Sequence, residues 1–80
     1  MYYVYLIRSL KNPQKTYIGY TNNLDQRLEK HNNGTSIATT DCRPWKLVTY
    51  IAFDDETKAL EFEKYLKVGS GHAFAQRRLW

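Results

Sequence analysis

The sequence has a single cysteine, Cys42, and it lacks any long apolar run. One thiol can build neither an internal disulfide framework nor a cysteine-based zinc cluster, so we expect Cys42 to have no disulfide partner. The main apolar stretch, Tyr2 to Ile7, is far shorter than a membrane span needs, and the chain start lacks the features of a signal peptide. These absences favour a soluble protein of the reducing cytoplasm that makes no membrane contact.

No internal repeat, low-complexity tract or linker interrupts the 80 residues, which fit one domain covering residues 1–80. Seven tyrosines, three phenylalanines and two tryptophans are more than so small a core needs, so some tyrosines should lie at a surface or in a cleft. Basic residues outnumber acidic ones by 12 to 8, which gives a net charge of +4 and a pI of about 9.3. This balance favours an anionic partner, of which nucleic acid is the commonest.

Aromatic and aliphatic runs separated by turn residues predict three strands, at residues 1–10, 15–21 and 45–53. Helices are predicted from a cap at Asn22 or Asn23 to Gly34, then at 54–67 with Asp54 or Asp55 as cap, and at 72–80. Residues 35–44 form a polar loop that is long for this chain. The expected fold class is α/β of the α+β type, with a small antiparallel sheet and helices in the order ββαβαα.

The first predicted helix carries two cationic side chains on its apolar stripe. With Leu24 set at zero and about 100° per residue, Leu28 lies at about 40°. His31 then falls at about −20° and Arg27 at about −60°, on the face that packs against the sheet. A cation on such a face commonly extends its charged end to solvent, so that reading of Arg27 stays open beside a functional one. His31 has the similar alternative of a satisfied core histidine.

The second long helix repeats this pattern with a negative charge. With Ala59 at zero, Leu66 lies at about −20° and Glu63 at about 40°, within the apolar stripe. A buried carboxylate needs a partner, and an ion pair with Arg27 is one structural explanation. The sheet supplies tyrosines to the same region, because Tyr5 and Tyr17 lie on neighbouring strands. Together these groups favour a cleft with a functional site.

The sequences YVY (Tyr3–Tyr5) and YIG (Tyr17–Gly19), followed by Arg27, His31 and then Glu63 in ALEFEKYLK, resemble the GIY-YIG nuclease superfamily. The chain is most similar to small single-domain bacterial members, and the likeness extends through RPWKLV to the ending GSGHAFAQRRLW. The resemblance implies a three-stranded antiparallel sheet flanked by helices. It also implies metal-dependent hydrolysis of DNA phosphodiester bonds. Because the sequence shows no attached recognition domain, we expect DNA structure rather than base sequence to direct the cleavage.

The resemblance further implies a role for each of five residues. Glu63 matches the single carboxylate that holds a divalent metal, Mg²⁺ or Mn²⁺. Arg27 matches the arginine that contacts the scissile phosphate, a task suited to a planar, permanently charged guanidinium. Tyr5 and Tyr17 match the tyrosines that orient or deprotonate the attacking water. His31 matches a helix position that is histidine or tyrosine in several members.

The sequence departs from the family pattern at three places. Val4 stands where the motif has isoleucine, a nearly neutral change. Tyr3 stands where the motif has glycine, a bulky replacement that could alter the cleft wall. Some members use an asparagine after the metal-binding glutamate, but none follows Glu63, which leaves that role empty or passes it to Ser70 or His72.

Two other functions remain as alternatives. One is a non-catalytic nucleic-acid-binding module that retains the fold, and the other is a protein-interaction domain acting through residues 35–44. Scattered cations could line a path for phosphates, although most would simply be solvated. These cations are Arg8, Lys11, Lys15, Arg43, Lys46, Lys67, Arg77 and Arg78.

Overall fold

The computed structural model describes residues 1–34 and 37–80. Its elements are β1 (Tyr2–Ser9), β2 (Thr16–Thr21), α1 (Leu24–Asn32), a 3₁₀ helix η1 (Ile37–Cys42), β3 (Trp45–Phe53), α2 (Glu56–Lys67) and α3 (Gly69–Arg78). This order confirms the predicted α+β class and the ββαβαα sequence of elements. In the described residues, no helix has the length and apolar character that crossing a membrane requires.

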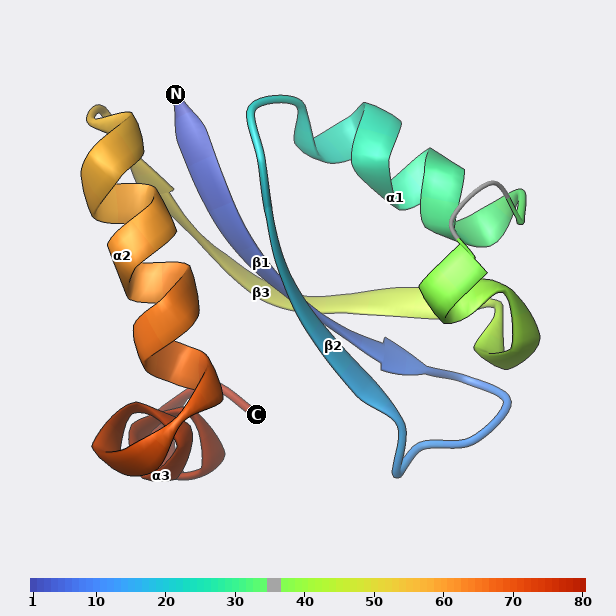
Figure 1. The fold of residues 1–80 in the computed structure, drawn as a ribbon. Coiled ribbons are helices and arrows are strands. Elements are labelled where there is room, and N and C mark those ends of the chain that lie inside the picture. Colours follow the sequence, from blue (N-terminus) through green and yellow to red (C-terminus); the bar gives the residue numbers. More distant parts are fainter. Residues whose placement is uncertain (35–36) are drawn as a thin grey trace.

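The three strands form one antiparallel sheet in the order β2-β1-β3, so β1 is central and β2 is an edge. Tyr5 in β1 pairs with Gly19 in β2 on one side and with Tyr50 in β3 on the other. An irregularity between Leu6 and Ile7 shifts the register toward β3. The β2 edge therefore keeps a regular register past Tyr5, and it faces the viewer in Figure 1.

Alternation along β1 divides the core between the two faces of the sheet. Val4 and Leu6 pack on one face with buried residues of α2 and α3, namely Ala59, Leu66 and Ala75. Tyr5 and Ile7 pack on the other face with Trp45, against Leu24 and Leu28 of α1. Figure 1 shows the consequence, with α1 on one side of the sheet and α2 and α3 on the other. Each fully buried aliphatic side chain contributes roughly 1.5–3 kcal/mol to this arrangement.

Side-chain caps fix where the two long helices begin. The Asn23 side chain accepts a hydrogen bond from the Gln26 backbone N–H (3.1 Å), and Asp55 accepts one from Thr57 N–H (2.9 Å). Two of the predicted caps are thereby confirmed. The Tyr20 hydroxyl donates to Glu56 Oε2 (2.6 Å), which joins the first turn of α2 to the edge strand.

The structure corrects the sequence prediction at two segments. The third helix begins at Gly69 rather than at residue 72, because Gly69 makes the chain reversal with φ 56° and Gly71 lies inside α3. A Cβ at Gly71 would overlap the Tyr65 carbonyl oxygen, so its absence allows α3 to pack closely on the end of α2. The predicted loop 35–44 contains η1, while residues 35 and 36 lie outside the described part of the chain.

Candidate active site

A buried chain of hydrogen bonds joins β1, α1 and η1. The Tyr5 hydroxyl lies 2.8 Å from His31 Nε2, and His31 Nδ1 lies 2.7 Å from Thr39 Oγ1. Tyr5 has no solvent exposure, and His31 and Thr39 are each 1% exposed. The apolar stripe of α1 brings His31 here, since Leu24 and Leu28 on the same face contact the sheet. Both ring nitrogens of the histidine are thus engaged, and its orientation is fixed.

Gly19 gives the Tyr5 phenol its position. Tyr5 and Gly19 are cross-strand partners, and a Cβ built on Gly19 would overlap the phenol oxygen and ring. The ring therefore lies over the backbone of β2 and extends toward the sheet edge. A glycine inside a strand commonly marks a bulge or a close approach of another group. Here it allows a close approach, made by the Tyr5 side chain.

Tyr17 adds a second phenol beside this chain. Its ring centroid lies 6.3 Å from that of Tyr5 and 5.2 Å from that of His31, in an edge-on arrangement. Tyr17 is half-buried on the edge strand, whereas Tyr5 is fully enclosed. The two tyrosines therefore differ in access, and Tyr17 is the one that solvent can reach.

In the protein without substrate, the surroundings of Tyr5 favour the protonated phenol. Burial raises the pKa of the Tyr5 phenol to about 12, with Tyr17 and Glu63 acting in the same direction. The Arg27 guanidinium opposes this shift, by its charge and as a hydrogen-bond donor. Burial also lowers the pKa of His31, and Arg27 lowers it further, so a neutral imidazole is favoured. A neutral His31 can accept the proton that Tyr5 donates.

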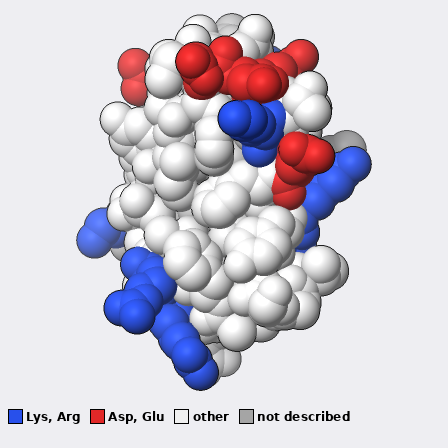
Figure 2. Space-filling view, turned by 90° about the vertical axis from the view of Figure 1, so that its left-hand side faces the viewer, with Lys and Arg blue, Asp and Glu red and all other residues white. Residues whose placement is uncertain are grey.

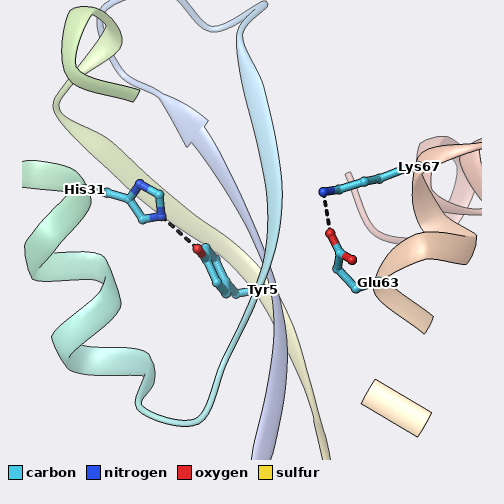
Figure 3. Close-up of polar contacts among 4 residues, drawn as sticks. All are labelled: Tyr5, His31, Glu63 and Lys67. Atoms are coloured by element: carbon cyan, nitrogen blue, oxygen red, sulfur yellow. Dashed lines mark hydrogen bonds and ion pairs between the residues drawn. The ribbon is translucent and has the colours of Figure 1, made fainter. Parts of the chain in front are cut away.

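Glu63 reaches the same edge from the opposite face of the sheet. It forms an ion pair with Lys67, one helical turn further along α2, and its side chain is 15% exposed whereas that of Lys67 is 46% exposed. The Lys67 ammonium lies 5.9 Å from the centre of the Tyr17 ring. Figure 3 shows Tyr5 and His31 on one side of β2 and Glu63 with Lys67 on the other.

The structure thus brings together all five predicted site residues, but as two groups. Tyr5, Tyr17 and His31 are in mutual ring or hydrogen-bond contact, with Arg27 acting on the phenol. Glu63 influences Tyr5 through its charge across the strand edge. Within the described residues its ion pair is with Lys67, not with Arg27 as one sequence interpretation had it.

Two residues of this region were missed by sequence reasoning as members of the site. Thr39 lies in a polar segment without periodicity, so no pattern marked it as buried. Lys67 was counted only as one of eight scattered cations. The (i, i+4) spacing from Glu63 to Lys67 is the signal that could have found this pair.

The available donors fit a divalent metal only with help from a substrate. Within the described residues, no group of three or more His, Cys, Asp or Glu side chains could hold a metal. Glu63 is a carboxylate whose side chain is 15% exposed and whose charge acts on the Tyr5 phenol. Mg²⁺ keeps several waters and needs only one or two protein carboxylates when phosphate oxygens complete its shell. This donor set therefore fits a metal that is shared with a bound phosphate.

The departures from the family pattern do not crowd this edge. The Tyr3 ring packs edge-on against Tyr50 of β3, with centroids 5.7 Å apart, on the side of β1 away from β2. His72 lines a hollow that Lys67 and Tyr17 also line, whereas Ser70 lines a separate hollow with Arg77. Of the two candidates for the missing asparagine, His72 is therefore the one on the Glu63 side.

Cations do not form one continuous band over the face of α2 and α3 that Figure 2 shows. Acidic side chains gather at the end where α2 begins, with cations directly beside them, and further cations lie at the end occupied by α3. The surface between these two ends is largely uncharged. The exposed large hydrophobic residues of this region are Leu60 and Tyr65 of α2, Phe74 of α3 and Val68 between the two helices. This face therefore offers phosphates no continuous cationic path.

Comparisons with known proteins agree with this arrangement. Residues 1–74 match the family model of the GIY-YIG catalytic domain. A UPF0213 protein of Clostridium perfringens is 38% identical over 68 residues, which cover 84% of this chain and 71% of that protein. The fold is also similar to the solution structure of a UPF0213 protein from Bacillus halodurans, with a TM-score of 0.56 and 27% sequence identity. The superposition covers 99% of this chain and 87% of that protein's chain.

A longer fungal protein is also similar to this chain. The structure-specific endonuclease subunit slx1 of Talaromyces marneffei is 41% identical over 68 residues, which cover 78% of this chain. The match spans only 18% of that protein's length, so the likeness concerns one part of it. The family match, the relatives and the geometry at the β2 edge lead to one conclusion: the chain belongs to the GIY-YIG family.

Proposed function

We propose that the protein is a metal-dependent endonuclease that hydrolyses phosphodiester bonds in DNA. One observation carries the proposal: Arg27 and Glu63, from opposite faces of the sheet, both act on the buried Tyr5 phenol that His31 holds at the strand edge. Phosphodiester hydrolysis requires a positioned nucleophile and stabilisation of negative charge, and a guanidinium, a carboxylate and fixed phenols are groups that can supply these. Membership of the GIY-YIG family supports the same reaction.

Arg27 and Glu63 would grip the substrate from two sides. The guanidinium of Arg27 offers paired donors to two oxygens of the scissile phosphate. The Glu63 carboxylate would hold Mg²⁺ or Mn²⁺, which when bound supplies Lewis-acid stabilisation of the developing negative charge. Lys67 must leave Glu63 for this to occur, and its ammonium is then free to contact a neighbouring phosphate.

The two tyrosines would share the handling of the attacking water. Tyr17 lies at the accessible edge and would orient the water by its hydroxyl group. Tyr5 is enclosed, and its hydroxyl is hydrogen-bonded to His31 Nε2, whose ring Thr39 keeps in place through Nδ1. The phenol pKa of about 12 in the protein without substrate means that an added positive charge is needed before Tyr5 gives up its proton.

The proposed substrate is DNA distinguished by its structure, such as a flap, a branch or a nick. Several relatives carry the name structure-specific endonuclease subunit, which supports this class for the present chain. A single strand edge with one guanidinium would contact phosphates rather than base edges, and phosphate contacts carry no sequence information.

A non-catalytic nucleic-acid-binding module is the second candidate. The observation that favours it is the ion pair of Glu63 with Lys67, which neutralises the carboxylate proposed to bind metal. Such a module would bind DNA in a salt-dependent manner and leave it intact. Binding would then be indifferent to the loss of the Glu63 carboxylate.

A cleavage assay separates the two candidates. Purified protein is incubated with supercoiled, linear, flap and junction DNA, with Mg²⁺, with Mn²⁺ or with a chelator. We expect cutting of at least one branched or nicked form with either metal, abolished in Glu63→Ala and Arg27→Ala while circular dichroism shows a retained fold. Glu61→Ala and Lys64→Ala, which remove exposed charges from α2, are the matched controls. Salt-dependent binding without cleavage of any form would select the second candidate.

A further inference from the structure

A hollow of about 270 Å³ lies on the other side of β2 from His31, between the edge strand and the corner of α2 and α3. Its lining includes Tyr17, Ile18, Lys67, His72, Gln76 and Trp80. The walls are mixed in character, with an indole and aliphatic carbons beside an amide, an imidazole and an ammonium. Walls of this kind suit a flat, polar-edged ring more than a purely apolar ligand.

The hollow adjoins the candidate active site, because two residues belong to both. Tyr17 lines it and also contacts His31 and Tyr5 by its ring. Lys67 lines it and also forms the ion pair with Glu63. A phosphate held between Arg27 and Glu63 would therefore place an adjoining nucleotide at the mouth of this hollow.

Trp80 gives the hollow an aromatic wall in a defined place. Its backbone N–H donates to the Ala75 carbonyl (3.0 Å) at the end of α3, and the Arg8 guanidinium lies over its indole, 5.4 Å from the ring centre. The indole also packs on the core cluster of Val4 and Leu6. Figure 1 shows this end of the chain turned from α3 toward β2. Aromatic faces fixed beside cations are the surfaces on which unpaired bases stack.

We propose that this hollow receives one unpaired nucleobase, from a nucleotide next to the scissile phosphate, with Trp80 as its stacking partner. The proposal rests on the proposed nuclease function and specifies its substrate. A base that is paired in a duplex would have to leave its partner to enter the hollow. Flaps, nicks and branches contain unpaired or weakly stacked bases, which cost the least free energy to unstack. This subsite would therefore make the protein prefer such DNA structures.

A substrate series with abasic positions tests the subsite in the cleavage reaction. The cut is first mapped on a flap, and then each nucleotide within three positions of it is replaced in turn by an abasic residue. We expect one abasic position to lower single-turnover kcat/KM by about tenfold, the order of effect that a lost base–aromatic stack produces. Trp80→Ala should slow the intact substrate by a similar factor and be insensitive to that same abasic position.

Control variants keep the result interpretable if Trp80→Ala is poorly folded. Trp80→Phe keeps an aromatic face and should retain most of the abasic sensitivity. Gln76→Ala removes only an exposed polar group of the hollow and should reduce kcat/KM with thermal stability unchanged. Phe74→Ala removes an aromatic side chain that lines the separate hollow on α3 and should have no effect.

A binding measurement without metal separates this proposal from the nuclease function. Trp45 is 7% exposed and donates from its indole N–H to the Thr39 carbonyl, so Trp80 is the tryptophan that a ligand in the hollow can reach. In the presence of a metal chelator, we expect a short single-stranded oligonucleotide to quench the tryptophan fluorescence of the wild-type protein. We expect no such quenching in the Trp80→Phe variant. Quenching without cleavage of any DNA would overturn the nuclease function and leave the subsite standing. Cleavage that is indifferent to every abasic position and to Gln76→Ala would overturn the subsite.

Discussion

The phenol of Tyr5 lies over the backbone of Gly19, its partner on the neighbouring strand, where no other residue type would leave room for it. Because of this contact, the Tyr5 hydroxyl lies at the edge strand, where side chains of both α1 and α2 act on it. His31 holds it from one face, and the charge of Glu63 acts on it from the other. The candidate site is thus built around an edge of the sheet rather than on one of its faces.

Gly19→Ala should displace the Tyr5 ring, because the added methyl group would overlap the phenol. We expect the free energy of unfolding to fall by about 1–3 kcal/mol, as for other overpacked sites, and DNA cleavage to be lost. Urea denaturation measures the first effect. In a Tyr5→Leu background, where the phenol is absent, the same substitution should cost much less. An equal cost in both backgrounds would mean that the ring is not what Gly19 accommodates.

Thr39→Val should leave His31 Nδ1 without its partner in a buried position. The shape is retained, so the expected loss of about 1–3 kcal/mol in unfolding free energy reflects the missing hydrogen bond. The His31 ring nitrogen signals in NMR spectra should change as well. Thr57→Val, at an exposed site in the first turn of α2, is the matched control and should stay within about 0.5 kcal/mol of the normal protein.

Stability should depend on pH through His31. Burial and Arg27 lower its pKa, so the folded protein binds fewer protons than the unfolded chain, whose histidines titrate at about 6.5. The stabilisation is therefore fully present above about pH 6.5 and is lost as the pH falls through the lowered pKa of the folded state. Denaturation midpoints measured across this range should drop on the acid side.

Two histidine variants identify the source of that pH dependence. His31→Gln should flatten the profile, whereas His72→Gln, which changes an exposed histidine, should preserve it. A profile that is unchanged in His31→Gln would show that another group is responsible.

Lys67→Met should make the Glu63 carboxylate more available to a metal. The ammonium and a divalent cation compete for the same oxygens, so we expect half-maximal cleavage at a lower Mg²⁺ concentration than in the normal protein. The stability cost should be below about 1 kcal/mol, since Lys67 is largely exposed. Lys64→Met serves as control. A higher Mg²⁺ requirement in Lys67→Met would indicate that Lys67 assists metal binding instead of opposing it.

Periodicity was sufficient to find three ionisable residues of the site, although not Lys67. The helical repeat placed Arg27 and His31 on the stripe that faces the sheet, and His31 is indeed 1% exposed. The same repeat placed Glu63 inward on its helix, where its side chain is 15% exposed. These positions follow from local geometry, since the hydrophobic residues of each helix determine which face packs on the sheet.

The sequence pattern did not predict which groups meet across the sheet. Periodicity does not say which face of the sheet a helix covers, so the placement of α1 and α2 on opposite faces was not predicted. Thr39 is buried by its tertiary contact with His31, although its neighbours in the sequence are polar. The close approach over Gly19 likewise depends on strand register, which a single glycine in a strand does not specify.

The most direct test of the account is whether the two sides of the edge strand act as one catalytic unit. Single-turnover cleavage of the preferred DNA form is measured for Arg27→Ala, for Glu63→Gln and for the double variant, all with folded protein. Groups that act together have strongly non-additive effects, so the double variant should be no slower than the more impaired single variant. A near-normal rate in either single variant, or losses that simply multiply in the double variant, would contradict the account.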